Sequence, residues 1–79
     1  MNVRVHFFGM IAEAVNSSLH IMEHYEGSTL ADVEKDLLDL YPQLNQFSYQ
    51  MALDQKLAHA DALLMPENEV AILPPFAGG

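Results

Sequence analysis

The most restrictive feature of this sequence is a short apolar run near its end that stops abruptly at two prolines. The run is Val70-Ala71-Ile72-Leu73, and Pro74-Pro75 follow it directly. A short, continuously apolar segment bounded by turn residues is typical of a strand buried inside a sheet. Proline lacks the N–H donor that a central strand needs, so the strand must end there. We therefore expect a sheet that contains this late strand and an extended tail over residues 74–79.

Three earlier segments predict further strands and a short helical connection. Val3 to Phe8 alternates, with Val3, Val5 and Phe7 on the face that we assign to the core. Leu19 to Tyr25 alternates again, and the spacing of apolar residues from Met10 to Val15 predicts a short helix between the two strands. Met51 to Ala58 is expected to form two short strands that reverse at Asp54-Gln55.

One longer helix is predicted between the second strand and this pair. Its apolar residues recur at helical spacing and form one stripe, and Pro42 ends the helix near Leu40. The stripe consists of Leu30, Val33, Leu37, Leu40 and Tyr41. The order of elements predicts the α+β class, with one main helix packed across a mixed sheet of about five strands. A chain of 79 residues has room for one core, so residues 1–79 are expected to form a single domain.

Composition excludes several classes of function. The chain has no cysteine, which removes disulfides, zinc–thiolate sites and a cysteine nucleophile. Its net charge is −8, with three cationic residues against eleven acidic ones, so a nucleic-acid surface or an anionic membrane is not expected as a partner. We also expect no signal peptide and no membrane span, which makes the cytosol the default compartment.

The four histidines do not predict a metal site. They are His6, His20, His24 and His59. His20 and His24 lie four residues apart in a predicted strand, and the rise of a strand places them too far apart to share an ion. We therefore expect no bound metal.

The tail has the properties of a reactive end. Pro74-Pro75 fix φ near the polyproline value and should form a stiff stalk. Gly78 and Gly79 have no Cβ and can pass through a channel that any side chain would block. The α-carboxylate of Gly79, with a reference pKa of about 3.5, is ionised at neutral pH. Such a carboxylate can attack the α-phosphate of ATP, and a sulfur nucleophile can then displace AMP and leave a thiocarboxylate.

The C-terminal segment from Glu69 to Gly79 resembles the signature of molybdopterin synthase small subunits, the ubiquitin-like sulfur carriers of molybdenum cofactor synthesis. The stretches Val3 to Phe8, Thr29 to Pro42 and Met51 to Leu57 are also similar to that family. The resemblance implies a β-grasp (ubiquitin-like) fold. It also implies that Gly79 is adenylated, converted to a thiocarboxylate and used to donate sulfur to cyclic pyranopterin monophosphate.

The same resemblance implies partners. An adenylating enzyme of the ubiquitin-activating type would use ATP on Gly79, and a sulfur-donor system would supply the sulfur. The large synthase subunit would receive the tail, as part of a heterotetramer, and would hold the catalytic side chains. No permanently bound cofactor is expected. Within the tail, Pro74, Pro75, Phe76, Ala77 and Gly78 would thread into the partner. The candidate partner contacts are Phe7, Leu73 and Phe76, and a contact by Phe7 or by Phe8 depends on which face of the first strand is exposed.

Three other functions remain open at this stage. A sulfur carrier for thiazole synthesis also ends in Gly-Gly, but such carriers usually lack the Pro-Pro stalk. A protein modifier would be joined to lysines through Gly79. A noncatalytic binding module would tolerate the loss of Gly79.

Overall fold

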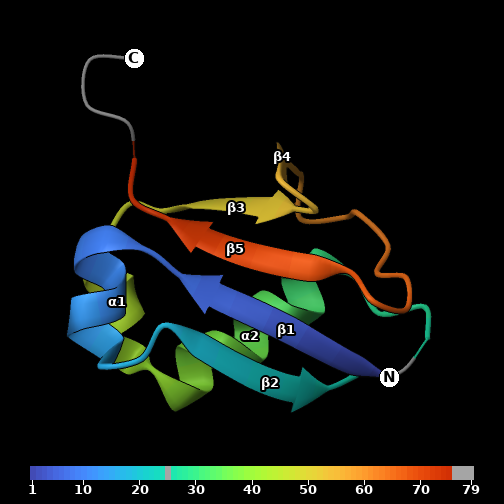
Figure 1. Cartoon of the computed structure of the whole chain (residues 1–79), viewed down its shortest axis with the longest axis horizontal. Helices are drawn as coiled ribbons and strands as arrows, with labels where there is room; N and C mark the ends of the chain where they lie inside the picture. The colour runs from blue at the N-terminus through green and yellow to red at the C-terminus, as the bar shows by residue number, and fades with distance from the viewer. Residues whose placement is uncertain (25, 76–79) are drawn as a thin grey trace.

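The structure is a computed structural model that describes residues 1–24 and 26–75. A short helix connects two antiparallel strands, a longer helix crosses behind them, and three further strands complete the sheet (Figure 1). In chain order the elements are β1 (Asn2–Phe7), α1 (Gly9–Val15), β2 (Leu19–Glu23), α2 (Leu30–Leu40), the 3₁₀ helix η1 (Pro42–Gln46), β3 (Gln50–Leu53), β4 (Lys56–Leu57) and β5 (Glu69–Leu73).

The strand that ends at the two prolines lies in the middle of the sheet. The strand order is β2-β1-β5-β3-β4. β5 pairs in parallel with β1 and antiparallel with β3, while β1 pairs antiparallel with β2 (Figure 1). A mixed five-stranded sheet with one main helix across it is the β-grasp arrangement, so the predicted fold class is confirmed.

The core lies between the sheet and α2. Val3, Val5 and Phe7 of β1 face it together with Val70 and Ile72 of β5, which are their partners or near neighbours in the ladder. From α2, Leu30, Val33 and Leu37 fill the same space, and each is at most 1% exposed. These side chains belong to one cluster of buried residues, which Ile11, Val15, Leu44 and Leu64 complete.

The predicted apolar stripe of α2 is wrong at its last turn. Leu40 is 55% exposed, although its spacing places it in line with Leu37. The helix ends at Leu40, and Pro42 opens η1 directly afterwards, so the chain turns before this side chain reaches the core. Tyr41 is partly buried instead, and its ring makes an edge contact with Phe7 at a centroid distance of 5.4 Å.

The turn between β3 and β4 also anchors the start of β5. Asp54 and Gln55 have φ of 50° and 71°, the left-handed conformation that two-residue hairpin loops require. The Asp54 carboxylate accepts hydrogen bonds from the Glu69 N–H at 2.8 Å and from the Asn68 amide. Asp54 therefore fixes the β3–β4 hairpin to the segment that leads into the central strand.

One boundary differs from the sequence-based expectation. β2 ends at Glu23 rather than continuing to Tyr25, which lies outside the described residues. The segment from Ala60 to Leu64 contains one hydrogen-bonded turn, in which the Ala62 N–H donates to the His59 carbonyl at 3.0 Å. Its backbone also pairs with the start of α2, where the Leu30 N–H donates to the Ala62 carbonyl at 2.9 Å.

Truncation of a buried side chain in α2 should cost much more stability than truncation of an exposed one three residues later. Leu37→Ala removes a fully buried side chain and should lower the free energy of unfolding by about 2–5 kcal/mol. Leu40→Ala, on the same helix, should change it by less than about 0.5 kcal/mol. Urea unfolding followed by circular dichroism measures both, and equal losses would contradict the assignment of the core.

Candidate functional site

The candidate site begins at the end of the sheet where the neighbouring strands β1 and β5 both finish. Because the two strands are parallel, their carboxyl ends meet there, with Phe7 opposite Ile72 in the last pair. The Phe8 N–H extends this ladder by donating to the Ile72 carbonyl at 3.2 Å. Pro74 and Pro75 continue beyond this point, away from the end of the sheet (Figure 1). The stalk is therefore attached directly to the most central strand.

The four residues to which the chemistry was assigned follow this stalk. Phe76, Ala77, Gly78 and Gly79 lie outside the described residues, so their predicted roles as threading residues and reactive end stay predictions. Leu73, another candidate partner contact, is half-buried at the end of β5 opposite Gln50.

The predicted partner contact at Phe7 is wrong. Phe7 is 2% exposed and belongs to the core cluster, packed against Tyr41. The next residue, Phe8, points to the opposite face and is 47% exposed. Alternation along β1 thus resolves the choice between the two rings, and Phe8 is the one available to another molecule.

The face of the sheet that α2 does not cover carries several apolar side chains. The ladder places Leu19 beside His6 and Ile21 beside Arg4 on this face, and Leu19 and Ile21 are 43% and 54% exposed. The Phe8 ring lies over His6 with the ring centroids 6.4 Å apart. We call the side chains of Arg4, His6, Phe8, Leu19, Ile21, Glu69, Ala71 and Leu73 the open sheet face.

A shallow hollow interrupts the open sheet face beside the first half of β5. It has a volume of about 210 Å³ and is lined by His6, Phe8, Gln55 and the first three residues of β5. His6 Nε2 lies 3.4 Å from Glu69 Oε1 across it. A mainly apolar face of this kind, next to the emerging tail, suits contact with another protein.

Sequence reasoning missed Gly9, which lies against the stalk. Gly9 has φ of +58°, and a Cβ at this position would lie 3.2 Å from Pro74 Cγ. The available signal was its place two residues after the end of β1, because a strand that pairs in parallel with the last strand must end beside the tail. Pairing between the first and last strands was not part of the sequence-based prediction.

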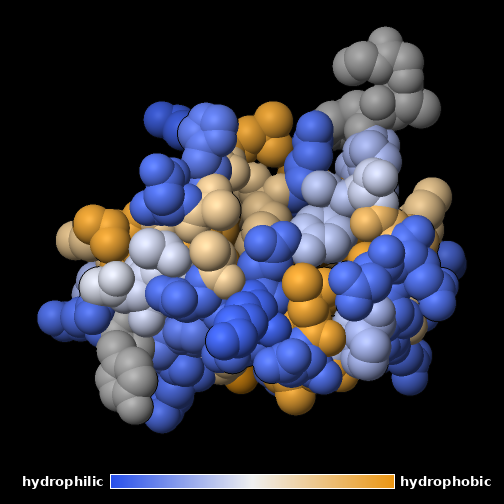
Figure 2. Space-filling view, turned by 180° about the vertical axis from the view of Figure 1, so that it is seen from behind, coloured by the Kyte–Doolittle hydropathy of each residue, from blue (hydrophilic) through white to orange (hydrophobic). Residues whose placement is uncertain are grey.

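The opposite side of the molecule is predominantly hydrophilic. Figure 2 shows this side, where hydrophilic residues spread over the helix layer with smaller apolar patches between them. Exposed acidic residues of α2 contribute to it, namely Asp32, Asp36 and Asp39. These acidic residues lie on the helix side of the sheet, opposite the open sheet face, so a protein bound to one surface would not cover the other.

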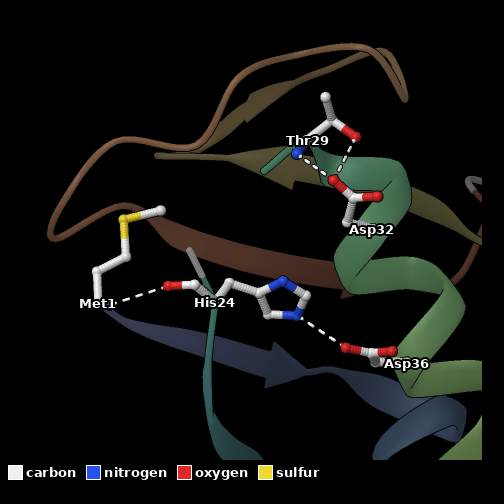
Figure 3. Close-up of polar contacts among 5 residues, drawn as sticks. All are labelled: Met1, His24, Thr29, Asp32 and Asp36. Atoms are coloured by element: carbon white, nitrogen blue, oxygen red, sulfur yellow. Dashed lines mark hydrogen bonds and ion pairs between the residues drawn. The ribbon is translucent and has the colours of Figure 1, made fainter. Parts of the chain in front are cut away.

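Two of these acids already have partners within the chain. Asp32 Oδ2 accepts hydrogen bonds from the Thr29 N–H at 2.8 Å and the Thr29 hydroxyl at 3.2 Å, which caps the start of α2 (Figure 3). These hydrogen bonds, the backbone one foremost, lower the pKa of Asp32 from its ordinary value. Asp36 Oδ2 lies 3.0 Å from Nε2 of His24 (Figure 3).

His24 links the helix to the start of the chain. Its side chain is 8% exposed between β2 and α2. Its backbone carbonyl accepts a hydrogen bond from the Met1 ammonium group at 2.9 Å (Figure 3). Its N–H donates to the Met1 carbonyl at 3.0 Å. This pair of bonds extends the β1–β2 ladder, so we assign the His24 region a structural role.

A second polar pair lies at the other edge of α2. The Tyr49 hydroxyl donates to Glu34 Oε2. Partial burial, followed by this hydrogen bond and the nearby negative charge, raises the pKa of Tyr49 well above its usual range. Tyr49 is therefore a neutral hydrogen-bond donor at physiological pH and has no feature of a catalytic base.

Residues 1–24 and 26–75 contain no group of three or more His, Asp or Glu side chains placed to hold a metal ion. No helix within these same ranges has the length and apolar character needed to cross a membrane.

Comparison with known proteins gives the family. The model of the ThiS family matches residues 5–79, which is nearly the whole chain. The chain belongs to the ThiS family. The match includes the second half of β1, the central strand β5 and the tail.

Individual relatives agree with this membership. The molybdopterin synthase sulfur carrier subunit of Caenorhabditis elegans is 29% identical over 83 residues, covering 100% of this ThiS-family chain and 99% of its own. Small archaeal modifier protein SAMP1 of Haloferax volcanii has a similar structure, with a TM-score of 0.86, 19% identity and full coverage of both chains. The resemblance to molybdopterin synthase small subunits that the tail suggested is thus confirmed.

A third relative comes from a protein complex. In a structure of subunits 1 and 2 of the molybdopterin-converting factor of Helicobacter pylori, one chain matches with a TM-score of 0.73 and 22% identity, covering 100% of both chains. This likeness again shows the fold.

The cap at Asp32 makes stability depend on pH in a predictable direction. The pKa of Asp32 is lower in the folded protein, so its contribution is present above the unfolded value of about 3.9 and is lost as the pH falls through the folded value. Asp32→Asn should therefore be less stable than the original protein at pH 7, and the difference should shrink below pH 4. Urea unfolding at pH 7 and at pH 2 measures it; the same difference at both pH values would contradict the cap.

Proposed function

We propose that this chain is the sulfur-carrier subunit of a molybdopterin synthase and that it carries sulfur as a thiocarboxylate on Gly79. The observation that carries this proposal is the course of β5. The strand is paired on both sides, and Pro74 and Pro75 lie beyond its last ladder pair. Two of the four residues between Leu73 and the Gly78-Gly79 end are prolines, whose backbone torsions are restricted.

The chemistry needs only the α-carboxylate of the chain. A carboxylate oxygen of Gly79 attacks the α-phosphorus of ATP, pyrophosphate leaves, and an acyl-adenylate forms. A hydrosulfide equivalent then adds to the acyl carbon and AMP departs with the bonding electron pair, which leaves a thiocarboxylate. Where the donor is a protein persulfide, the first product is an acyl disulfide, and a second thiol of the donor system cleaves its S–S bond.

The absence of cysteine agrees with this chemistry. The chain has no thiol that could hold the sulfur or compete for the activated carbonyl. A glycine at each of the last two positions leaves the acyl carbon free of side-chain hindrance, so a narrow active site can enclose it. In this proposal the chain is a substrate-like subunit, and the catalytic side chains belong to the large subunit.

The open sheet face provides a surface for the proposed partners. It is continuous with the root of the tail through Phe8 and Leu73, so a partner that binds it would also meet the stalk. The adenylating enzyme and the large synthase subunit would each need the same carboxylate. They would therefore bind in turn, first to load sulfur and then to transfer it to cyclic pyranopterin monophosphate. Two carriers with two large subunits would make the heterotetramer.

A carrier for thiazole synthesis is the nearest alternative, because membership in the ThiS family fits both. The same loading reaction serves the two pathways, and they differ in the acceptor of the sulfur. The stalk Pro74-Pro75 favours the molybdopterin reading. A protein modifier would instead form amide bonds between Gly79 and lysines, which the experiments below would detect as conjugates rather than as a thiocarboxylate.

Incubation with a ubiquitin-activating-type adenylating enzyme, ATP and a sulfur donor should change the mass of the intact chain by the difference between one sulfur and one oxygen. Deletion of Gly79 should abolish the change, and addition of one tryptophan after Gly79 should do the same by blocking the enclosed site. Intact-mass spectrometry reads the result. An unchanged mass in the presence of an enzyme proven competent on another carrier would sink the proposal.

Removal of the Phe8 side chain should weaken the partner complex without unfolding the protein. Phe8→Ala removes an exposed aromatic ring beside the tail, so its affinity for the large subunit should fall at least about tenfold, or about 1.4 kcal/mol. Leu63→Ala is the matched control, because Leu63 is 61% exposed but lies outside the open sheet face. Titration calorimetry compares them, and equal affinities would contradict the assigned surface.

A further inference from the structure

Gly9 and Pro74 form a close contact at the point where the tail leaves the sheet. Gly9 is the first residue of α1 and has φ of +58°, a conformation that side-chain-bearing residues rarely adopt. A Cβ placed on Gly9 would lie 3.2 Å from Pro74 Cγ and 3.9 Å from Pro74 Cδ. The first distance is tighter than ordinary contact, so a side chain at Gly9 would require the proline ring to move.

A hydrogen bond prevents the strands from separating to relieve such a contact. The Phe8 N–H, one residue before Gly9, donates to the Ile72 carbonyl, two residues before Pro74, at 3.2 Å. Phe7 and Ile72 form the ladder pair next to it, and both side chains are buried. The two strand ends are therefore fixed in the core, and any adjustment must be made by the stalk.

We propose that Gly9 is a positioning residue, whose bare Cα supports the Pro74 ring and sets the direction in which the tail leaves the sheet. The expected effect of Gly9 on adenylation rests on the proposed function. The contact itself is a property of the fold and does not depend on that function.

Restricted torsions make the stalk sensitive to this contact. The rings of Pro74 and Pro75 fix two successive φ angles, so a shift of the Pro74 ring cannot be absorbed by rotation about those bonds. A rotation at the root of a stiff segment moves its far end by more than it moves the root. Misplacement of a reacting group by about 1 Å can cost about a hundredfold in rate.

The chain contains a matched control for the backbone strain. Gly27 also has a positive φ, of +90°, and a Cβ placed there would meet no atom within 4 Å. Gly9→Ala and Gly27→Ala both force alanine into a left-handed backbone. Only Gly9→Ala adds an atom against the stalk, so a difference between the two variants reports the contact rather than the strain.

The proline provides the second half of the test. Pro74→Ala removes the Cγ and Cδ atoms that the new methyl group would meet. If the contact positions the tail, part of the damage caused by Gly9→Ala should disappear when Pro74→Ala is also present. A double-mutant cycle measures this coupling.

The functional measurement is ATP–pyrophosphate exchange by the adenylating enzyme with the full-length chain as substrate. Gly9→Ala should lower kcat/KM at least about tenfold, mainly through kcat, because the carboxylate is bound but misdirected. Gly27→Ala should retain the original value, and the double variant should recover part of the loss. Equal values for the two glycine variants, or no recovery in the double variant, would overturn the inference.

A second measurement needs no enzyme and separates this inference from the proposed function. Amide chemical shifts of Ala77, Gly78 and Gly79 should change in Gly9→Ala and stay unchanged in Gly27→Ala. If the original chain is never adenylated but these shifts respond as stated, the proposed function fails and the positioning role stands. If the shifts do not respond in Gly9→Ala, the positioning role fails whatever the enzyme does.

Discussion

The structure depends on one constraint, the parallel pairing of the first strand with the last. β5 enters the sheet between β1 and β3, and its inward residues Val70 and Ile72 complete the core that β1 and α2 begin. Residues 4 and 69 are partners in this ladder, so the ends of the described chain must come together before the sheet closes. Pairing of segments so distant in sequence ties the root of the tail to the folding of the whole molecule.

That pairing also gives the two faces of β5 different surroundings. Val70 and Ile72 hold the strand in the core, while Ala71 and Leu73 face the side of the sheet that α2 leaves uncovered. The chain then passes from a strand bonded on both sides to a stalk that cannot bond in a ladder. A strand bonded on both sides directly before the stalk fits the proposed carrier, because a partner could bind the tail while the strand stays in the sheet.

Much of this architecture could be predicted from the sequence, since it rests on periodicity. Alternation gave β1, helical spacing gave α2 with its limit near Leu40, and the apolar run before Pro74 gave β5. Alternation places Phe7 and Phe8 on opposite faces of β1, but the sequence alone does not show which face a partner can reach. The structure does, because Phe7 is buried and Phe8 is the exposed ring.

The exposed face of β2 and the role of Gly9 could not be predicted, because both depend on which strands are neighbours in the sheet. Leu19 and Ile21 are apolar, yet they lie on the open sheet face because their ladder partners are Arg4 and His6 on β1. The role of Gly9 appears only once β1 is placed beside β5. Strand order is set by packing of the complete chain, and no local pattern encodes it.

In the proposed function, this chain delivers sulfur from its own C-terminus. The most direct measurement is to load the chain with radioactive sulfur, purify it, and mix it with a large synthase subunit and cyclic pyranopterin monophosphate. We expect the label to leave the protein and to appear in the dithiolene product, while the carrier returns to its carboxylate mass. Label that stays on the protein, or that reaches no pterin product, would contradict it.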